Sequence, residues 1–113
     1  MDIAVTHDAD IAMLQLTGSL LTDAEGTQLM EAVLQELEAG QKRFVLDLSE
    51  LKHVNSSGLG IFIRLLTRIR TAGGELVVCG ISPGLSNLFT ITKLHTIFRI
   101  ADSRDAARQL FSA

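Results

Sequence analysis

The sequence predicts one α/β domain in which a mixed β-sheet with parallel βαβ crossovers is covered by about four helices. Short apolar runs alternate along the chain with stretches in which apolar residues recur at helical spacing. The 113 residues, 47% of them hydrophobic, suffice for one core and are too few for two ordinary domains. No repeat, linker or low-complexity tract divides the chain, so we expect residues 1–113 to form a single domain.

Five short apolar runs are predicted to be β-strands. They cover residues 3–5, 11–16, 44–48, 75–79 and 97–100. A turn at Asp8-Ala9-Asp10 makes the first two runs a hairpin. The run at 44–48 is almost uniformly apolar and too short to span a membrane, so we expect a strand that is covered on both faces. The run at 75–79 has the same character, and the last run is expected at an edge of the sheet.

Four helices are predicted from their start and stop residues. Their predicted starts are Thr22, the segment 55–58, Ser82 with Pro83, and Asp102 with Ser103. Thr22 and Glu25 have the spacing of a capping box, and Pro83 at a first helical position costs no hydrogen bond. Gly40 and Gly73 supply the left-handed conformation that ends the first two helices.

Three loops of this arrangement are expected on one rim of the sheet. They lead from a strand into a helix at residues 18–22, 55–58 and 80–84. Parallel strands place their carboxyl ends on the same edge, and open α/β folds bind ligands there. The rim is therefore the predicted binding face.

The most informative of these loops is the second. Ser56 and Ser57 lie where a buried strand gives way to the first turn of an amphipathic helix, and either Asn55 or Ser56 could cap that helix. Backbone N–H groups are unpaired in a first turn, and the helix dipole favours negative charge there by about 0.3–1 kcal/mol. The corner suits an anion, either as a bound ligand or attached to a serine.

Several functional classes are disfavoured by the composition. The net charge is -3 and no run of Lys or Arg is present, which argues against a nucleic-acid partner. Cys79 is the only cysteine and lies in an apolar run, so we expect a buried thiol and no disulfide. The chain has neither a leader pattern nor 18 consecutive apolar residues, so we expect a cytoplasmic protein without membrane insertion.

Catalytic, metal and cofactor sites are also disfavoured. Asp47, His53 and Ser56 supply the residue types of a catalytic triad, but not the Gly-x-Ser-x-Gly elbow or a suitable spacing. The three histidines are scattered without ligand spacing, and a dinucleotide fingerprint fails at Ile63, where glycine is needed. We therefore expect no enzyme activity, no metal and no cofactor.

Segment 47–63, which reads DLSELKHVNSSGLGIFI, resembles the STAS domain family, and in particular its bacterial anti-sigma factor antagonists. Gly18-x-Leu20 and the segment 73–83 extend the resemblance over nearly the whole chain. The resemblance implies a phosphorylation switch at Ser56 and a partner that is both an anti-sigma factor and a serine kinase. The unmodified antagonist would capture that partner and release a sigma factor, and a phosphatase would be a further partner.

The expected contact surface for the partner follows the three loops. Its residues are Leu20, Leu21, Thr22, Asn55, Ser56, Ser57, Gly58, Leu59, Ser82 and Pro83. Two positions depart from the family pattern: Asn55 stands where the family usually has Asp, and Leu21 where it commonly has Asp.

Two other functions stay open. One is a STAS subunit of a lipid-transport or stress-signalling assembly in which Ser56 is never modified; the other is a small nucleotide-binding protein or enzyme that uses the anion corner directly.

Overall fold

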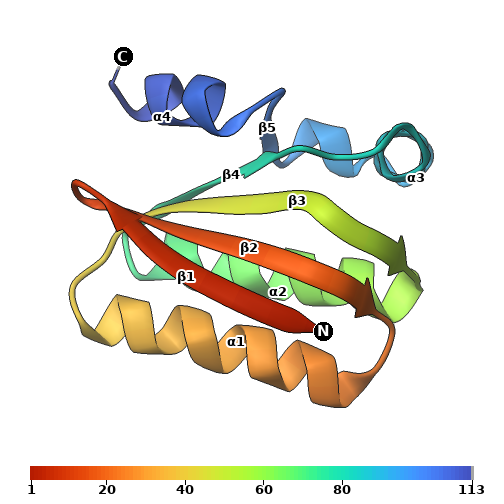
Figure 1. Ribbon diagram of the computed structural model, residues 1–113, viewed down its shortest axis with the longest axis horizontal. Coiled ribbons are helices and arrows are strands. Elements are labelled where there is room, and N and C mark those ends of the chain that lie inside the picture. The colour runs from red at the N-terminus through yellow and green to blue at the C-terminus, as the bar shows by residue number, and fades with distance from the viewer. Residues whose placement is uncertain (113) are drawn as a thin grey trace.

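The computed structural model describes residues 1–112 and has the predicted order of strands and helices (Figure 1). The elements are β1 (Asp2–Asp8), β2 (Ile11–Leu20), α1 (Asp23–Glu38), β3 (Arg43–Val54), α2 (Ser56–Thr71), β4 (Glu75–Cys79), α3 (Pro83–Ile91), the 3₁₀ turn η1 (Leu94–Thr96), β5 (Arg99–Ala101) and α4 (Arg104–Ser112). The predicted α/β class with a mixed sheet is confirmed. None of the helices in this part of the chain is long and apolar enough to cross a membrane.

The sheet has the strand order β1-β2-β3-β4-β5. β1 pairs antiparallel with β2, and every later neighbour is parallel. The predicted hairpin is confirmed, because Asp8 pairs with Ile11 across a turn in which Ala9 has a φ of 55°. Each parallel step requires a crossover through a helix, which explains the alternation read from the sequence.

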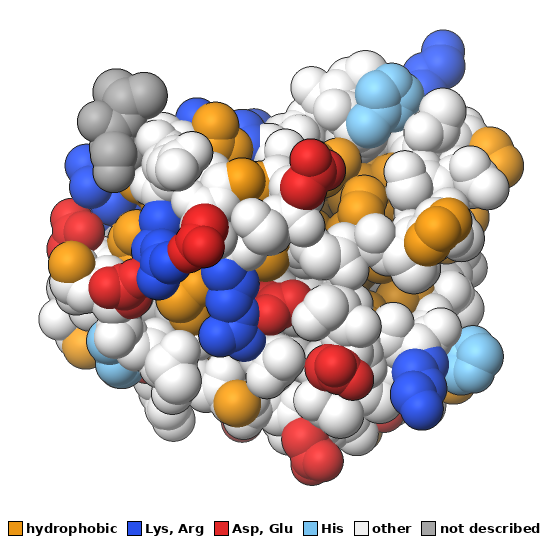
Figure 2. All heavy atoms as spheres, turned by 45° about the horizontal axis from the view of Figure 1, so that its top comes forward, with side chains coloured by type: hydrophobic (Ala, Val, Ile, Leu, Met, Phe, Trp, Pro, Cys, Tyr) orange, Lys and Arg blue, Asp and Glu red, His pale blue; other side chains and the backbone are white. Residues whose placement is uncertain are grey.

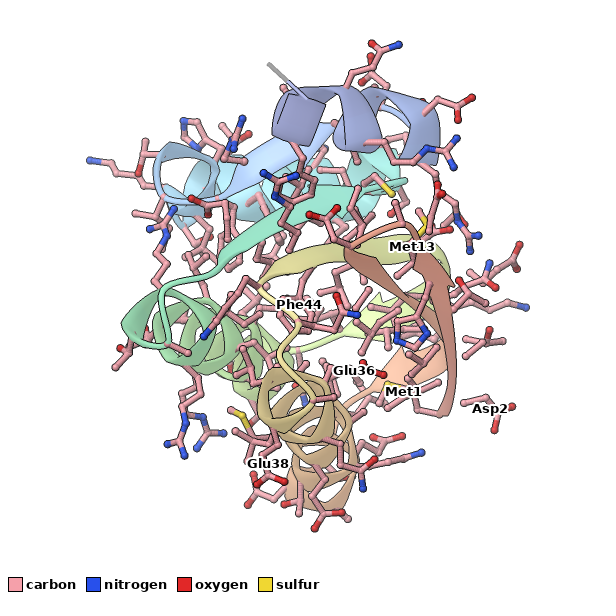
Figure 3. All side chains as sticks on the ribbon, turned by 90° about the vertical axis from the view of Figure 1, so that its left-hand side faces the viewer. Met1, Asp2, Met13, Glu36, Glu38 and Phe44 are labelled. Carbon is pink, nitrogen blue, oxygen red and sulfur yellow. The ribbon has the colours of Figure 1, made fainter. Side chains whose placement is uncertain are left out.

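Two cores lie on opposite faces of this sheet. The larger core packs under α1, α2 and α3, and its largest side chains, Phe44, Phe62 and Phe89, are at most 1% exposed. The smaller core lies under α4 and includes Met13, Val77 and Cys79. Figure 3 shows Phe44 on the side of α1 and α2 and Met13 on the side of α4. The prediction that Cys79 is buried is confirmed.

Four strands differ in their bounds from the prediction. β1 spans Asp2–Asp8 and not only residues 3–5. β2 continues past Gly18 to Leu20, and β3 continues past residue 48 to Val54. The two pair over this extension through two register shifts, where β3 carries additional residues. Those residues of β3 are largely polar, so the hydrophobic pattern did not indicate a strand. The last strand is Arg99–Ala101 and not 97–100, because the 3₁₀ turn precedes it and Phe98 packs on Phe89 at a centroid distance of 5.6 Å.

The helix ends follow the predicted chemistry. Thr22 and Glu25 form the capping box, and Ser82 accepts a hydrogen bond from the Leu85 N–H at 3.2 Å. Gly40 and Gly73 have φ angles of 95° and 83°, as left-handed stops require. At the last helix, the cap is Ser103, whose Oγ accepts from the Ala106 N–H at 3.1 Å.

Candidate functional site

The carboxyl ends of β2, β3 and β4 lie on one edge of the sheet, and their loops into α1, α2 and α3 form what we call the rim (Figure 1). A side chain links the first two loops directly, because the Asn55 Nδ2 donates to the Leu21 carbonyl at 3.0 Å. The second and third loops meet at a shallow hollow that Val54 and Ser82 help to line. The three loops therefore form one continuous surface.

Ser56 is the first residue of α2 and is exposed to solvent. Asn55 is the residue that caps the helix, since its Oδ1 accepts from the Gly58 N–H at 3.0 Å. Ser56 is thus not needed as a cap, and within residues 1–112 its hydroxyl makes no recorded hydrogen bond. The result is a free hydroxyl at the N-terminus of a 16-residue helix, where a negative charge is favoured.

Gly58 sets how closely α2 approaches the end of β2. A Cβ at this position would lie 2.6 Å from the Leu20 carbonyl oxygen and 2.8 Å from the Val54 Cγ1. Such contacts exclude any side chain, so glycine allows the two loops to touch. Gly60 differs, because a Cβ there would meet nothing within 4 Å.

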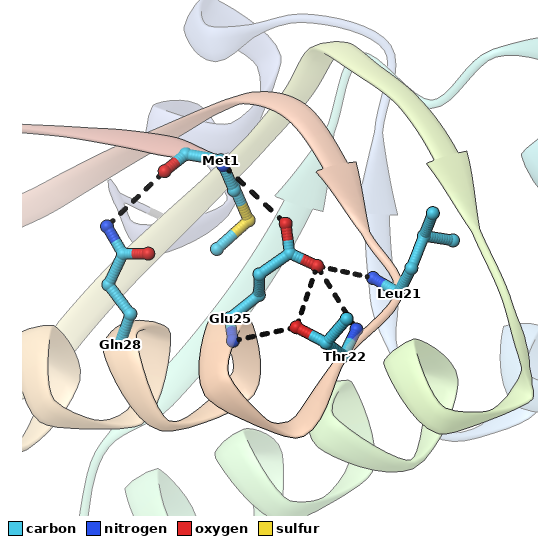
Figure 4. Close-up of polar contacts among 5 residues, drawn as sticks. All are labelled: Met1, Leu21, Thr22, Glu25 and Gln28. Atoms are coloured by element: carbon cyan, nitrogen blue, oxygen red, sulfur yellow. Dashed lines mark hydrogen bonds and ion pairs between the residues drawn. The ribbon is translucent and has the colours of Figure 1, made fainter.

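Glu25 holds the first loop in place (Figure 4). Its Oε1 accepts from the Leu21 N–H at 2.9 Å and from both the N–H and hydroxyl of Thr22 at 3.1 Å. The amino group of Met1 lies 3.6 Å from its Oε2. The hydrogen bond from the Leu21 N–H is the main cause that lowers the pKa of the Glu25 carboxyl, so this carboxylate is charged at neutral pH. Figure 4 shows the Leu21 side chain pointing away from these contacts, and it is 42% exposed.

The structure divides the predicted contact residues into two groups. Leu21, Thr22, Asn55, Ser56, Ser57, Ser82 and Pro83 are exposed. Leu20 is 0% exposed and Leu59 is 6% exposed, and Gly58 is buried between the loops. The expectation that these three contribute contact surface is therefore corrected: they belong to the core and to the packing of α2, because β2 and α2 turn those positions inward.

The residue types of a triad are not brought together. Asp47 is 5% exposed and accepts from the Ser49 N–H at 3.0 Å and from the Arg104 Nε at 2.6 Å. Burial raises the pKa of Asp47, but these two donors outweigh it and the pKa is lowered. The Asp47 carboxylate therefore helps to dock α4 and does not act on Ser56. No local sequence pattern indicates this pair, because Arg104 lies 57 residues from Asp47.

The remaining titratable groups of residues 1–112 lie apart from one another or in contacts of their own. No group of three or more His, Cys, Asp or Glu residues able to hold a metal ion occurs in the described part of the chain. His7 contacts Glu36 at 2.9 Å, and the ring of His95 lies 3.3 Å from the Phe89 carbonyl oxygen. Burial raises the pKa of the Cys79 thiol to about 11, so this cysteine stays protonated and unreactive.

Comparison with known proteins gives one consistent result. The sequence model of the family described as the STAS domain matches residues 2–107. BtrV of Bordetella bronchiseptica, named as an anti-sigma factor antagonist, is 34% identical over 101 residues, which cover 89% of this chain and 84% of BtrV. An anti-sigma F factor antagonist of Paenibacillus polymyxa is 30% identical over 107 residues, with coverage of 91% and 88%.

Solved structures share the fold. A Thermotoga maritima protein, described as an anti-sigma factor antagonist, superposes with a TM-score of 0.90 at 20% identity, covering 98% of this chain and 95% of that one. The Bacillus cell fate determinant SpoIIAA in its phosphorylated form gives a TM-score of 0.73 at 15% identity, with coverage of 96% and 99%.

Proposed function

We propose that this chain, which belongs to the STAS domain family, is an anti-sigma factor antagonist whose binding to its partner is controlled by phosphorylation of Ser56. The observation that carries the proposal is the free, exposed hydroxyl at the start of α2, on the rim shared by three loops. The names of the two relatives support the assignment. The SpoIIAA structure with the same fold in a phosphorylated form supports the switch.

Phosphorylation at this position is compatible with the fold. A phosphate adds about 1.5 to 2 negative charges and three acceptor oxygens. It would lie at a helix N-terminus, where such a charge is stabilised by about 0.3–1 kcal/mol. Because Asn55 makes the cap, esterifying Ser56 removes no hydrogen bond that the helix needs.

A partner packed on the rim would be affected much more strongly. The rim around Ser56 is built of short and mostly uncharged exposed residues: Leu21, Thr22, Asn55 and Ser57. A bulky dianion in the middle of this surface opposes close packing by steric conflict and by the cost of removing its water. The unmodified chain thus captures the anti-sigma factor, a serine kinase of the bacterial cytoplasm, and frees a sigma factor. Phosphorylation ends the capture, and a phosphatase restores it.

One observation favours a second function. Leu21 is an exposed apolar side chain, and Asn55 beside it is neutral. An apolar and uncharged patch of this kind beside Ser56 suits a permanent contact in a larger lipid-transport or stress-signalling assembly. In that case Ser56 would never be modified.

The intact mass of the protein distinguishes the two functions. We expect incubation with the anti-sigma kinases of the source organism and ATP to add one phosphate to the wild type and none to Ser56→Ala. Ser57→Ala is the matched control, because Ser57 is also exposed and lies next to Ser56; it should accept phosphate as the wild type does. Absence of phosphate from the wild type with every kinase, together with stable copurification in a complex, would support the permanent subunit.

Binding measurements complete the test. We expect Ser56→Asp to weaken the affinity for the anti-sigma factor by about tenfold or more, because a hydrated charge is buried at the contact. Its thermal unfolding midpoint should stay within a few degrees of the wild type, since the helix N-terminus accepts the charge. Equal affinity of Ser56→Asp and the wild type would contradict the switch.

A further inference from the structure

A hollow of about 200 Å³ opens on the rim between the end of β3 and the start of α3. Its cause lies in the unequal length of the strands. The β3–β4 ladder ends where Asp47 pairs with Cys79, whereas β3 continues to Val54 with β2 as its only strand neighbour. Beyond Asp47, the place of β4 is taken by the loop to α3 and by α3 itself. A helix cannot fill the space beside a strand as another strand would, so the hollow remains.

The hollow has an apolar interior and a mouth bordered by one lysine and one histidine. The residues that define it are Leu51, Lys52 and His53 on β3, and Gly84, Leu85 and Leu88 on α3. The three leucines are buried or half-buried, whereas the two basic residues are exposed. In Figure 2 a depression with hydrophobic side chains at its base is bordered by Lys and His side chains.

Lys52 and His53 are not used by the fold. Within residues 1–112 neither side chain makes a recorded hydrogen bond or ion pair. Arg104, by contrast, is held by Asp47, and Arg43 by Asp10 at 3.2 Å. Two basic groups beside an apolar hollow are complementary to a carboxylate that accompanies an apolar side chain.

The size of the hollow points to a protein partner. Small-molecule sites usually enclose about 300–1,000 Å³, so about 200 Å³ is too little for a nucleotide or similar ligand. It is suited to one anchoring side chain, of the kind that dominates protein interfaces. Val54, which lines the hollow, lies two residues before Ser56, at the end of β3.

We propose that this hollow is a specificity pocket for the anti-sigma factor, which inserts one apolar side chain between β3 and α3 and places an adjacent Asp or Glu against Lys52 and His53. The proposal rests on the function proposed above and adds the kind of segment that the partner must present. Capture would then need both an unmodified Ser56 and an anchored side chain.

Filling the hollow tests the proposal. A Cβ at Gly84 would meet nothing within 4 Å, so Gly84→Met should occupy the hollow without disturbing the fold. Thr90→Met is the matched control, since Thr90 is exposed on the opposite side of α3. We expect Gly84→Met to weaken binding of the purified anti-sigma factor by about tenfold or more and Thr90→Met to leave it unchanged. Thermal unfolding midpoints near that of the wild type would establish that both variants are folded.

Charge reversal tests the acidic neighbour. We expect Lys52→Glu to weaken binding by about threefold to tenfold at low salt, and less at high salt. Lys93→Glu makes the same charge change at an exposed position away from the hollow and should have no effect.

Crosslinking identifies the partner segment. Cys79 is buried and unreactive, so a thiol crosslinker would attach to the introduced cysteine of Lys52→Cys. We expect it to reach a partner segment that holds an apolar residue beside Asp or Glu. Capture of a basic segment would overturn the proposal.

The binding measurements distinguish a failure of the pocket proposal from a failure of the phosphorylation switch. Wild-type affinity in Gly84→Met and Lys52→Glu, with binding still lost in Ser56→Asp, would overturn the pocket and leave the switch intact. Loss of binding in Gly84→Met with wild-type affinity in Ser56→Asp would support the pocket and overturn the switch.

Discussion

The two faces of the sheet are held by different forces. The face under α1, α2 and α3 buries a large apolar core in which Phe62 and Phe89 pack at a centroid distance of 6.5 Å. The face under α4 has a smaller core and is supplemented by charge pairs. Arg104 pairs with Asp47, and Arg108 pairs with Asp8 and Asp105.

This difference bears on where the proposed partner surface lies. The rim emerges from the large core, so its loops are supported by buried side chains such as Leu20 and Leu59 and can leave their own polar groups free. The α4 face uses its charged groups for docking one short helix. Free hydroxyl and basic groups therefore occur on the rim, while on the other face charges are used in the fold.

The largest expected effect tests the apolar face. Phe62→Ala removes a ring that is 0% exposed and should lower the free energy of unfolding by about 3–5 kcal/mol. Urea denaturation measures this change. Ile63→Ala is the control, because Ile63 is the next residue and is 38% exposed; its effect should be within about 0.5 kcal/mol. Similar losses in both variants would contradict the dominance of this core.

The second prediction concerns the charge pair under α4. Asp47→Asn removes the charge that accepts from Arg104 and Ser49, and should cost about 1.5–3 kcal/mol of unfolding free energy. Asp105→Asn changes an exposed carboxylate that also pairs with an arginine, and should cost less than about 1 kcal/mol. Equal small effects would mean that the apolar contacts of α4 suffice for its docking.

A comparison of two glycines tests the packing of the rim. Gly58→Ala should destabilise the protein by about 1–3 kcal/mol, because its Cβ would collide with the Leu20 carbonyl. Gly60→Ala has open space and removes a flexible residue from a helix, so it should be neutral or stabilising by about 0.5–1 kcal/mol. Thermal and urea unfolding of both variants provide the measurement, and a stabilised Gly58→Ala would refute the close approach.

The smallest expected effect is a difference between the two faces in how their contribution to stability depends on pH. The pKa of Asp47 is lowered in the folded state, so the unfolded chain binds more protons between the two pKa values. The stabilisation from Asp47 is complete above the ordinary carboxyl pKa of about 3.9 and is lost as the pH falls through the lower folded value. We expect the stability difference between wild type and Asp47→Asn to narrow below about pH 4. Phe62→Ala should show a difference that does not depend on pH in this range.

Much of the site was accessible from local patterns. The capping box at Thr22, the serine cap at Ser82 and the glycine stops depend on neighbouring residues, so short segments of sequence predict them. The shared rim followed from the alternation of strands and helices, because parallel strands must end on the same side. The exposed position of Ser56 at a helix start followed from both.

Other features were decided only by contacts between distant residues. The burial of Leu20 depends on β2 continuing past Gly18, and the hollow beside Leu51 depends on β3 outlasting β4. Asp47 finds its partner in a helix at the other end of the chain. The sequence by itself determined the order of elements, the caps of the helices and the edge on which the rim lies, because these depend on periodicity, capping and the direction of parallel strands. The length of the strands, the pairing of charges and the shape of the rim required the tertiary structure, because pairing register and long-range packing set them.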